Sequence, residues 1–395
     1  MSKDGVQRSL VGRENRVVYV INNAAFFCSH RLPIAIAAKS LGYDVYLVHG
    51  RAGSPEMELP AISEIEASGI KRIQIPLDSA SISPLGELRA VHALIRVLRE
   101  LRPSIVHAAS PKAVAYAGLA ATLAKVPLLV LSISGLGYAF TSRMGSVSPR
   151  AILSKVAIKL FRFAVKSHPE TIVVTQDSAD EVVMARAYPR AKVRLIPGSG
   201  VDTSLYREIS WEAKKNLVVL PSRLLSDKGV REFVIAAREL RADFPSWRFV
   251  LAGSAAYDNP QSIPVGEVEQ WVRQGEVEWL GYVKDTHNLL REAKVVCLPS
   301  YREGMPKVLL EAGAAKCAVV TTTDPGCQEA ILPNISGLVV PVRDSVAICR
   351  ALRFLLERPS VIKAYGEAGR LHVKERHSLD KIVNTFLEIY GRRHG

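Results

Sequence analysis

Two glutamates stand in one short stretch of the sequence where both could act on a single ligand. The stretch 301–315 reads YREGMPKVLLEAGAA, and its carboxylates Glu303 and Glu311 are eight positions apart. The apolar run VVCLPS (295–300) precedes it, which predicts a buried strand, a loop with Glu303 and a helix that contains Glu311. Carboxylates at the carboxyl end of a strand can accept hydrogen bonds from ligand hydroxyl groups.

The turn between the two glutamates supplies a second chemistry. Gly304, Met305 and Pro306 lead into the predicted helix, and proline is favoured in a first helical turn. A helix N-terminus offers N–H groups and partial positive charge to an anion. An anion site next to hydroxyl acceptors suits a nucleotide sugar. Taken alone, the two acids are also consistent with a solvated loop residue and a structural helix residue.

Basic residues and glycines follow other predicted strands. Arg223 and Lys228 stand in PSRLLSDKG (221–229), directly after an apolar run. An arginine makes forked contacts to phosphate oxygens, and a lysine adds a mobile point charge. Gly253 and Gly281 end two further strands, where a ligand can approach the backbone. The alternative for the two cations is an ordinary solvent-facing role.

Short apolar strands alternate with helical stretches along the chain, which is typical of parallel sheets covered by helices. In the first half the predicted strands are 16–22, 43–49, 104–109 and 171–175, and the predicted helices are 31–41, 56–68, 85–101 and 178–187. The pattern restarts after a polar segment at 198–210. The second half has predicted strands at 216–224, 248–254, 276–282, 295–300, 318–324 and 337–342, and a last helix at 378–393.

We therefore predict an α/β protein with two Rossmann-like, doubly wound parallel-sheet domains that face a central cleft. The boundary is placed at 200, so that the domains cover 1–200 and 201–375. Ligands of such sheets bind at the carboxyl ends of the strands. Arg223, Lys228 and both glutamates would then share one site.

Together these motifs resemble the retaining family-4 glycosyltransferases of the GT-B fold. Arg223, Lys228, Glu303 and Glu311 occur in the family's order, and the resemblance covers nearly the whole chain. It implies that the 201–375 domain binds a nucleotide sugar, that the 1–200 domain binds the acceptor, and that a helix at about 376–395 packs back onto the first domain. Retention, a UDP-linked donor and no cofactor are also implied.

The resemblance assigns roles to individual residues. Arg223 and Lys228 would hold the donor diphosphate, Glu303 the donor sugar and Glu311 the ribose hydroxyls. The remaining expected donor-site residues are Gly304, Met305, Pro306, Lys307, Val308, Gly253, Gly281 and Val283. The expected catalytic residues are Glu303, Arg223, Lys228 and His107. The chain contains no Asp-x-Asp, so a metal that bridges the diphosphate is not expected.

The first half is similar to a subgroup that acts on polyprenyl-diphosphate-linked sugars, namely the bacterial α-1,3-N-acetylgalactosaminyltransferases. The likeness rests on VHAASPKAVAYAGLAA (106–121) and SGLGYAFTS (134–142). It implies acceptor binding by Arg31, Ser110, Lys112 and Gly135. Two departures stand out: the loop at 22–31 lacks a glycine pair found in many relatives, and Ala109 replaces a histidine. His107 is therefore either an acceptor-side group or a strand-end histidine bonded to backbone.

Composition favours an anionic partner. The 395 residues carry a formal net charge of +14 and are 48% hydrophobic. The basic stretch at 149–167 has cations and apolar residues at near-helical spacing, which predicts either a surface helix or a membrane-docking helix. The five cysteines lack metal-site spacing and are expected to be reduced thiols. With neither a signal core nor a spanning segment evident, we expect a cytoplasmic protein on the inner face of the cell membrane.

Other readings of the sequence stay open. A GT-B-fold enzyme with a soluble acceptor, or a nucleotide-sugar epimerase, would use the same donor residues. A non-catalytic nucleotide-binding subunit would also retain them. Net charge alone prompts a nucleic-acid-binding protein, although no nucleic-acid module is recognisable, and we expect no such partner.

Overall fold

The computed structural model describes residues 15–51, 55–78, 83–133, 149–189, 191–207, 209–255, 259 and 261–391, with the backbone alone for 55–56 and 149–154. The chain divides into two compact units. Unit 1 comprises Met1–Pro197 and Val383–Gly395, and unit 2 comprises Gly198–Ile382. The division lies close to the expected boundary at 200. The returning segment joins unit 1 from Val383, later than the expected 376, and this point lies inside the helix α17 (Leu379–Ile389).

Unit 1 is built on a parallel sheet of seven described strands in the order β3-β2-β1-β4-β5-β6-β7. The strands are β1 (Arg16–Ile21), β2 (Asp44–Arg51), β3 (Lys71–Asp78), β4 (Ile105–Ala109), β5 (Leu128–Ile133), β6 (Thr171–Thr175) and β7 (Lys192–Leu195). The helices are α2 (Ala24–His30), α3 (Leu32–Ser40), α4 (Pro55–Ala67), α5 (Pro84–Leu101), α6 (Pro111–Leu123), α8 (Pro149–Ser167) and α9 (Ser178–Ala187).

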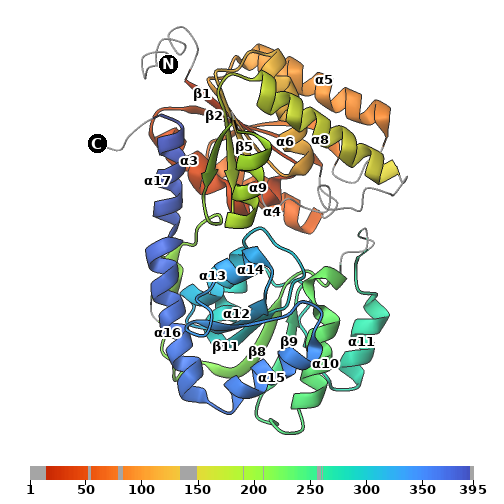
Figure 1. The fold of residues 1–395 in the computed structure, drawn as a ribbon, viewed down its shortest axis with the longest axis vertical. Helices are drawn as coiled ribbons and strands as arrows, with labels where there is room; N and C mark the ends of the chain where they lie inside the picture. Colours follow the sequence, from red (N-terminus) through yellow and green to blue (C-terminus); the bar gives the residue numbers. More distant parts are fainter. Residues whose placement is uncertain are drawn as a thin grey trace. The chain divides into compact units, whose positions relative to one another are not determined.

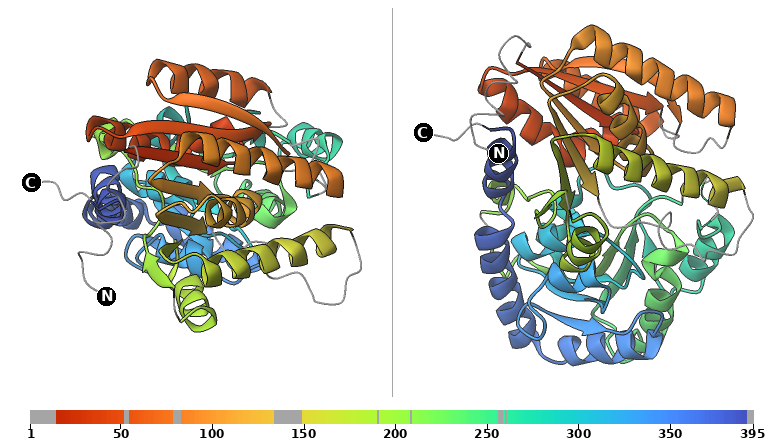
Figure 2. Two further views of the ribbon diagram at one scale, coloured as in Figure 1. Left: turned by 90° about the horizontal axis from the view of Figure 1, so that it is seen from above. Right: turned by 45° about the horizontal axis from the view of Figure 1, so that its top comes forward.

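Helices cover both faces of this sheet. Alternate strand residues such as Val18, Val106 and Leu129 pack with α5, α6 and α8, which follow one another along one side of the sheet (Figures 1 and 2). Helices α2, α3 and α4 contact strands β1 to β3. Because both faces are covered, β4 is buried along its whole length.

Unit 2 has a parallel sheet of six described strands in the order β10-β9-β8-β11-β12-β13. Strands β8, β9 and β11 of this sheet are labelled in Figure 1. The strands are β8 (Lys215–Pro221), β9 (Arg248–Ala252), β10 (Glu278–Trp279), β11 (Ala293–Leu298), β12 (Ala318–Thr322) and β13 (Gly337–Val340). The helices are η1 (Thr203–Tyr206), η2 (Ser226–Lys228), α10 (Val230–Leu240), α11 (Val265–Arg273), α12 (Thr286–Glu292), α13 (Lys307–Ala314), α14 (Pro325–Glu329), α15 (Ser345–Leu356) and α16 (Pro359–Arg376).

Two core layers sandwich the unit 2 sheet. Val218 and Val295 face α10 and α15, whereas Val219 and Val296 face α12, α13 and α16. This alternation confirms the predicted doubly wound α/β architecture. Strands β8 and β11 lie at the centre of the sheet and are direct neighbours. The loops that follow them therefore leave the same edge of the sheet.

Two local predictions are wrong. Residues 22–31 were predicted as a loop, but 24–30 form α2, whose N-cap Asn23 accepts a hydrogen bond from the Phe26 N–H. The strand predicted at 276–282 is only Glu278–Trp279, because the chain leaves the sheet and Gly281 adopts a φ of 63°. A positive φ of this size is compatible with a turn and not with a strand.

Candidate active site

An ion pair joins the loops that follow β8 and β11. Lys228, at the end of η2, donates from Nζ to Oε1 of Glu303, and both side chains are mostly buried. The Ser300 hydroxyl donates to the same carboxylate oxygen at 3.0 Å. Two of the predicted catalytic residues therefore lie in direct contact at the carboxyl edge of the central strands. This is the edge at which ligands of open parallel sheets bind.

Arg223 follows the same strand as Lys228 and is exposed. Its carbonyl accepts the Leu225 N–H at 2.8 Å, which holds the turn that leads into η2. Within the described part of the chain we find no ion-pair partner for its guanidinium group. The loop after β8 thus contains Lys228, whose charge is neutralised by Glu303, and Arg223, whose charge is available to a ligand.

Glu311 lies on the second turn of α13, half-buried beside three other side chains. Its carboxylate is 3.4 Å from the Lys307 ammonium, one turn earlier. Burial raises the pKa of Glu311, and the nearby Lys307 ammonium, with a smaller effect from His287, opposes that rise. Burial also raises the pKa of Tyr206, and the Glu311 charge adds to this. A partly desolvated carboxylate of this kind is a strong acceptor for ligand hydroxyl groups.

The turn before α13 is held by the core of unit 2. Gly304, Met305 and Pro306 are buried, and the Met305 side chain packs in the apolar layer under α13, together with Val308 at its edge. Pro306 is the N-cap of the helix, one position earlier than predicted. Because Met305 faces the core, its side chain does not contact a ligand, and donor binding by this turn stays a prediction.

The strand-end glycines have different surroundings. A Cβ on Gly253 would come within 1.8 Å of the Ser222 carbonyl oxygen, and the Trp279 indole donates to the Gly253 carbonyl at 2.8 Å. The close approach of the protein's own backbone is thus a structural reason for glycine at 253, and donor binding at this position stays a prediction. Gly281 faces open space. Val283 packs at the edge of the apolar layer under α13.

His107 lies in the interior of unit 1. Its Nδ1 is 2.6 Å from the Tyr390 hydroxyl and its Nε2 is 2.8 Å from the Ser132 hydroxyl, with no exposed surface. The Phe386 ring stacks on the imidazole and the Tyr19 ring lies tilted against it, each with its centroid 5.2 Å from that of the imidazole. A catalytic role for His107 is therefore wrong for this structure, because an acceptor cannot reach either ring nitrogen.

Arg31 is equally buried. Its guanidinium lies over the Phe386 ring and donates to the His30 carbonyl at 2.9 Å, with 1% of the residue exposed. The same aromatic side chain thus covers both Arg31 and His107. Direct acceptor binding by Arg31 is not compatible with this burial.

Ser110 and Lys112 lie where the sequence placed them, at the carboxyl end of β4 and the start of α6. Ser110 has a φ of 79°, and its hydroxyl accepts the Asn22 N–H at 3.3 Å. Lys112 pairs with Glu87 at 2.7 Å. Acceptor binding by these two residues stays a prediction. Gly135 lies outside the described residues.

Two acids that sequence reasoning missed hold segments at the carboxyl ends of strands in place. The Asp324 carboxylate accepts the backbone N–H of Glu303 at 2.9 Å. Glu58 accepts the N–H groups of Ala24 and Ala25 at 3.2 and 2.9 Å, so its carboxylate occupies the start of α2. Asp-Pro-Gly is a recognisable helix-start signal for Asp324. No sequence motif near Glu58 predicts its hydrogen bonds to the start of α2.

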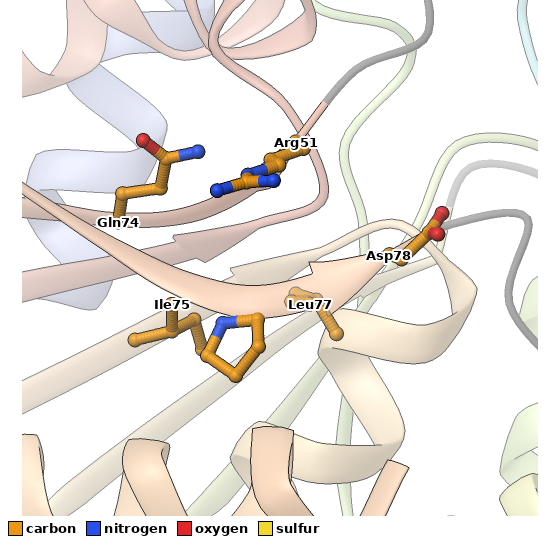
Figure 3. A pocket seen from close by; sticks show the side chains of 6 residues that line it. Arg51, Gln74, Ile75, Leu77 and Asp78 are labelled. Atoms are coloured by element: carbon orange, nitrogen blue, oxygen red, sulfur yellow. The ribbon is translucent and has the colours of Figure 1, made fainter. Parts of the chain in front are cut away.

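A separate pocket lies at the carboxyl end of the β2–β3 edge of unit 1 and has a volume of about 520 Å³. Figure 3 shows the side chains of Arg51 and Gln74 side by side, with Ile75 and Leu77 along β3. Among the residues that the structure describes, none of the predicted donor or acceptor residues lines it.

Comparisons with known proteins identify the family. Residues 203–372 match the family described as glycosyl transferases group 1, and residues 33–205 match glycosyltransferase family 4. The chain is a glycosyltransferase of this family-4, group-1 type. Its two Rossmann-like units make up the GT-B fold. HepE from Anabaena, solved in complex with UDP and glucose, has the same fold, with a TM-score of 0.75 over 96% of this chain and 100% of that chain at 18% identity.

The glycosyltransferase is similar over nearly its full length to two bacterial proteins. One is the N,N'-diacetylbacillosaminyl-diphospho-undecaprenol α-1,3-N-acetylgalactosaminyltransferase of Campylobacter jejuni, 26% identical over 95% of this chain and 98% of that protein. The other is the putative glycosyltransferase EpsD of Bacillus subtilis, 24% identical over 92% of this chain and 93% of that protein.

Two further observations concern the described residues alone. No group of three or more histidine, cysteine, aspartate or glutamate side chains in them is arranged to hold a metal ion. None of the helices in these residues combines the length and apolarity that crossing a membrane requires.

Proposed function

We propose that this glycosyltransferase moves a hexosyl or N-acetylhexosaminyl unit from a UDP-sugar to a polyprenyl-diphosphate-linked sugar, with retention of the anomeric configuration. The main support for donor binding by unit 2 is the Lys228–Glu303 ion pair at the carboxyl edge of its sheet. Arg223 follows the same strand, and Glu311 follows the same loop as Glu303. The name of the Campylobacter relative and the UDP bound by HepE support the choice of substrates.

The donor diphosphate would bind to the cations that follow β8. Arg223 is exposed, and Glu303 is the one carboxylate among the described residues that pairs with Lys228, so both cations can turn to phosphate oxygens. The N-terminal turn of α13 adds N–H groups and partial positive charge. Negative charge grows on the diphosphate as the donor bond breaks, so these groups stabilise the transition state more than the bound donor.

The two glutamates would hold the hydroxyl groups of the donor. Glu311, close to Tyr206 and His287, would accept from the ribose hydroxyls. Glu303 would accept from the transferred sugar once Lys228 engages the diphosphate. In the transfer, the bond from the anomeric carbon to the β-phosphate oxygen breaks, a bond to the acceptor oxygen forms, and the acceptor proton passes to the leaving phosphate. The products are UDP and the extended lipid-linked glycan.

In this proposal unit 1 binds the acceptor. Because the polyprenyl chain of the acceptor lies in a membrane, unit 1 would contact the membrane surface. On α8 the cations Lys155, Lys159, Arg162 and Lys166 are exposed. Val156 and Phe163, seven positions apart and so on one helical face, are each 44% exposed among them. The opposite face packs Phe161 and Val165 into the core. A helix with exposed apolar residues between cations suits an anionic lipid surface.

The experiment that tests the function is a panel of nucleotide sugars, with and without a polyprenyl-diphosphate-linked sugar, in which nucleoside diphosphate release is followed. Release from one donor only when the lipid-linked sugar is present is the expected result. Release that needs no acceptor would favour a nucleotide-sugar epimerase. Turnover on a soluble acceptor alone would remove the membrane part of the proposal. The anomeric configuration of the product then tests retention.

A further inference from the structure

The loop that carries Glu303 depends on the neighbouring strand for its position. It connects β11 to α13, and three contacts fasten it to the end of β12 and the turn that follows. The Thr322 hydroxyl donates to the Ser300 carbonyl at 2.6 Å. Asp324 accepts the Glu303 N–H at 2.9 Å. A Cβ on Gly326 would come within 1.7 Å of the Gly304 carbonyl oxygen, so the absence of a side chain there permits close packing.

Asp324 makes the central contact of this set. One carboxylate oxygen, Oδ2, accepts both the Glu303 N–H and, at 3.3 Å, the Cys327 N–H at the start of α14. Only 8% of the residue is exposed. The carboxylate therefore ties the first turn of a helix to the backbone of the residue that we place in the donor site. A buried N–H that loses its acceptor is costly, so the loop would move if Asp324 were truncated.

The Glu303 side chain is fixed separately. Ser300 donates to its carboxylate at 3.0 Å, and Lys228 pairs with it. Ser300 is itself held by Thr322 through its carbonyl group. The carboxyl end of β12 thus controls both the backbone of Glu303 and the hydroxyl that orients its carboxylate.

We propose that Asp324 is a positioning residue for Glu303, acting through the backbone of the β11–α13 loop. This inference rests on the proposed function, because it assumes that Glu303 contacts the donor. Asp324 does not touch the substrate in this account. Its contribution is geometric, and a shift of a catalytic group by about 1 Å can cost about 100-fold in rate.

Two substitutions separate geometry from charge. Asp324→Asn keeps one side-chain oxygen that can accept both N–H groups, so we expect kcat to stay within about threefold of the wild type. Asp324→Ala removes the acceptor, and we expect kcat to fall about 10- to 100-fold while the donor KM changes little. An Asn variant as inactive as the Ala variant would contradict positioning, because it would mean that the negative charge is required.

The decisive experiment is a double-mutant cycle with Glu303→Gln, measured as acceptor-dependent UDP release. If Asp324 acts through Glu303, Asp324→Ala should lower kcat in the wild type and change it by less than about twofold in the Glu303→Gln background. The matched control is Asp344→Ala. Asp344 caps α15 by accepting the Ala347 N–H at 2.8 Å, so its loss removes a comparable helix cap without touching the Glu303 loop.

The outcomes separate the two proposals. A Glu303→Gln enzyme with wild-type kcat would overturn the donor role of Glu303 in the proposed function. An impaired Glu303→Gln enzyme with equal Asp324→Ala effects in both backgrounds, or with none in either, would overturn the positioning role alone. If Asp324→Ala does not fold, Thr322→Val takes its place in the cycle. It removes the bond to Ser300 with little change of shape, and the same pattern of non-additivity is expected.

Discussion

Lys228 donates a hydrogen bond to the carboxylate of Glu303 at the carboxyl edge of the unit 2 sheet. The two residues follow neighbouring strands and neutralise each other, with 16% and 19% of their side chains exposed. In the proposed reaction the donor diphosphate attracts Lys228, and the Glu303 carboxylate becomes available to the sugar. The pair thus holds a cation and an acceptor ready in a partly desolvated position.

Glu311 should govern donor affinity rather than the chemical step. A hydrogen bond to a charged group contributes about 1.5–3 kcal/mol, so Glu311→Gln is expected to raise the donor KM about 10- to 100-fold with little change in kcat. Steady-state kinetics with varied donor checks this. Glu292→Gln is the matched control, because Glu292 forms an exposed pair with Lys215 away from the site. A fall in kcat at unchanged KM would contradict the ribose assignment.

The same carboxylate predicts a pH dependence of donor affinity. Burial raises the pKa of Glu311, so its proton returns at a higher pH than for an ordinary glutamate. Donor affinity should therefore fall on acidification from neutral pH, before exposed glutamates are protonated. UDP binding measured between pH 7 and 5 checks this, and the dependence should be weaker in Glu311→Gln. An equal dependence in the variant would place the titrating group elsewhere.

Much of the fold could be predicted from the sequence because its signals are local. Apolar runs and helical periodicity predicted β6, α8 and α9 with their observed bounds. The contacts that decide the role of His107 are not local, because Tyr390 is 283 positions away in the chain and Phe386 is similarly distant. The same holds for Gly253, whose close neighbour Ser222 directly follows the adjacent strand β8. At His107 and at Gly253 the residue type suggested contact with a ligand. Only the tertiary packing shows that each has a structural role.

The buried imidazole of His107 predicts how stability depends on pH. Burial, together with the Arg31 charge, holds the pKa of His107 well below its usual value. The unfolded chain therefore binds a proton that the folded chain does not, so stability should fall as pH drops below about 6.5. His107→Gln should reduce this slope by up to about 1.4 kcal/mol per pH unit. Denaturant unfolding at several pH values checks it, and an unchanged slope would contradict a buried neutral imidazole.

The α8 surface predicts binding to anionic lipid. Each juxtamembrane cation contributes about 1 kcal/mol, so replacing Lys155, Lys159, Arg162 and Lys166 by Gln should weaken vesicle binding at least about 100-fold at low salt. Sedimentation with phosphatidylglycerol-containing vesicles checks this, and added salt should weaken wild-type binding. The control replaces four exposed cations of unit 2, namely Arg273, Lys363, Lys374 and Arg376. Equal losses in both variants would show that net charge, and not α8, drives binding.

The most direct test of the account is the kcat for acceptor-dependent UDP release by the Lys228→Gln enzyme. Loss of one preorganised contact to the developing charge typically costs about 100- to 1,000-fold in kcat, and we predict a fall of this size. Lys215→Gln provides the comparison, because Lys215 forms an exposed ion pair at the other end of β8. A Lys228→Gln enzyme as fast as the Lys215→Gln enzyme would contradict the placement of the donor diphosphate at the Lys228–Glu303 pair.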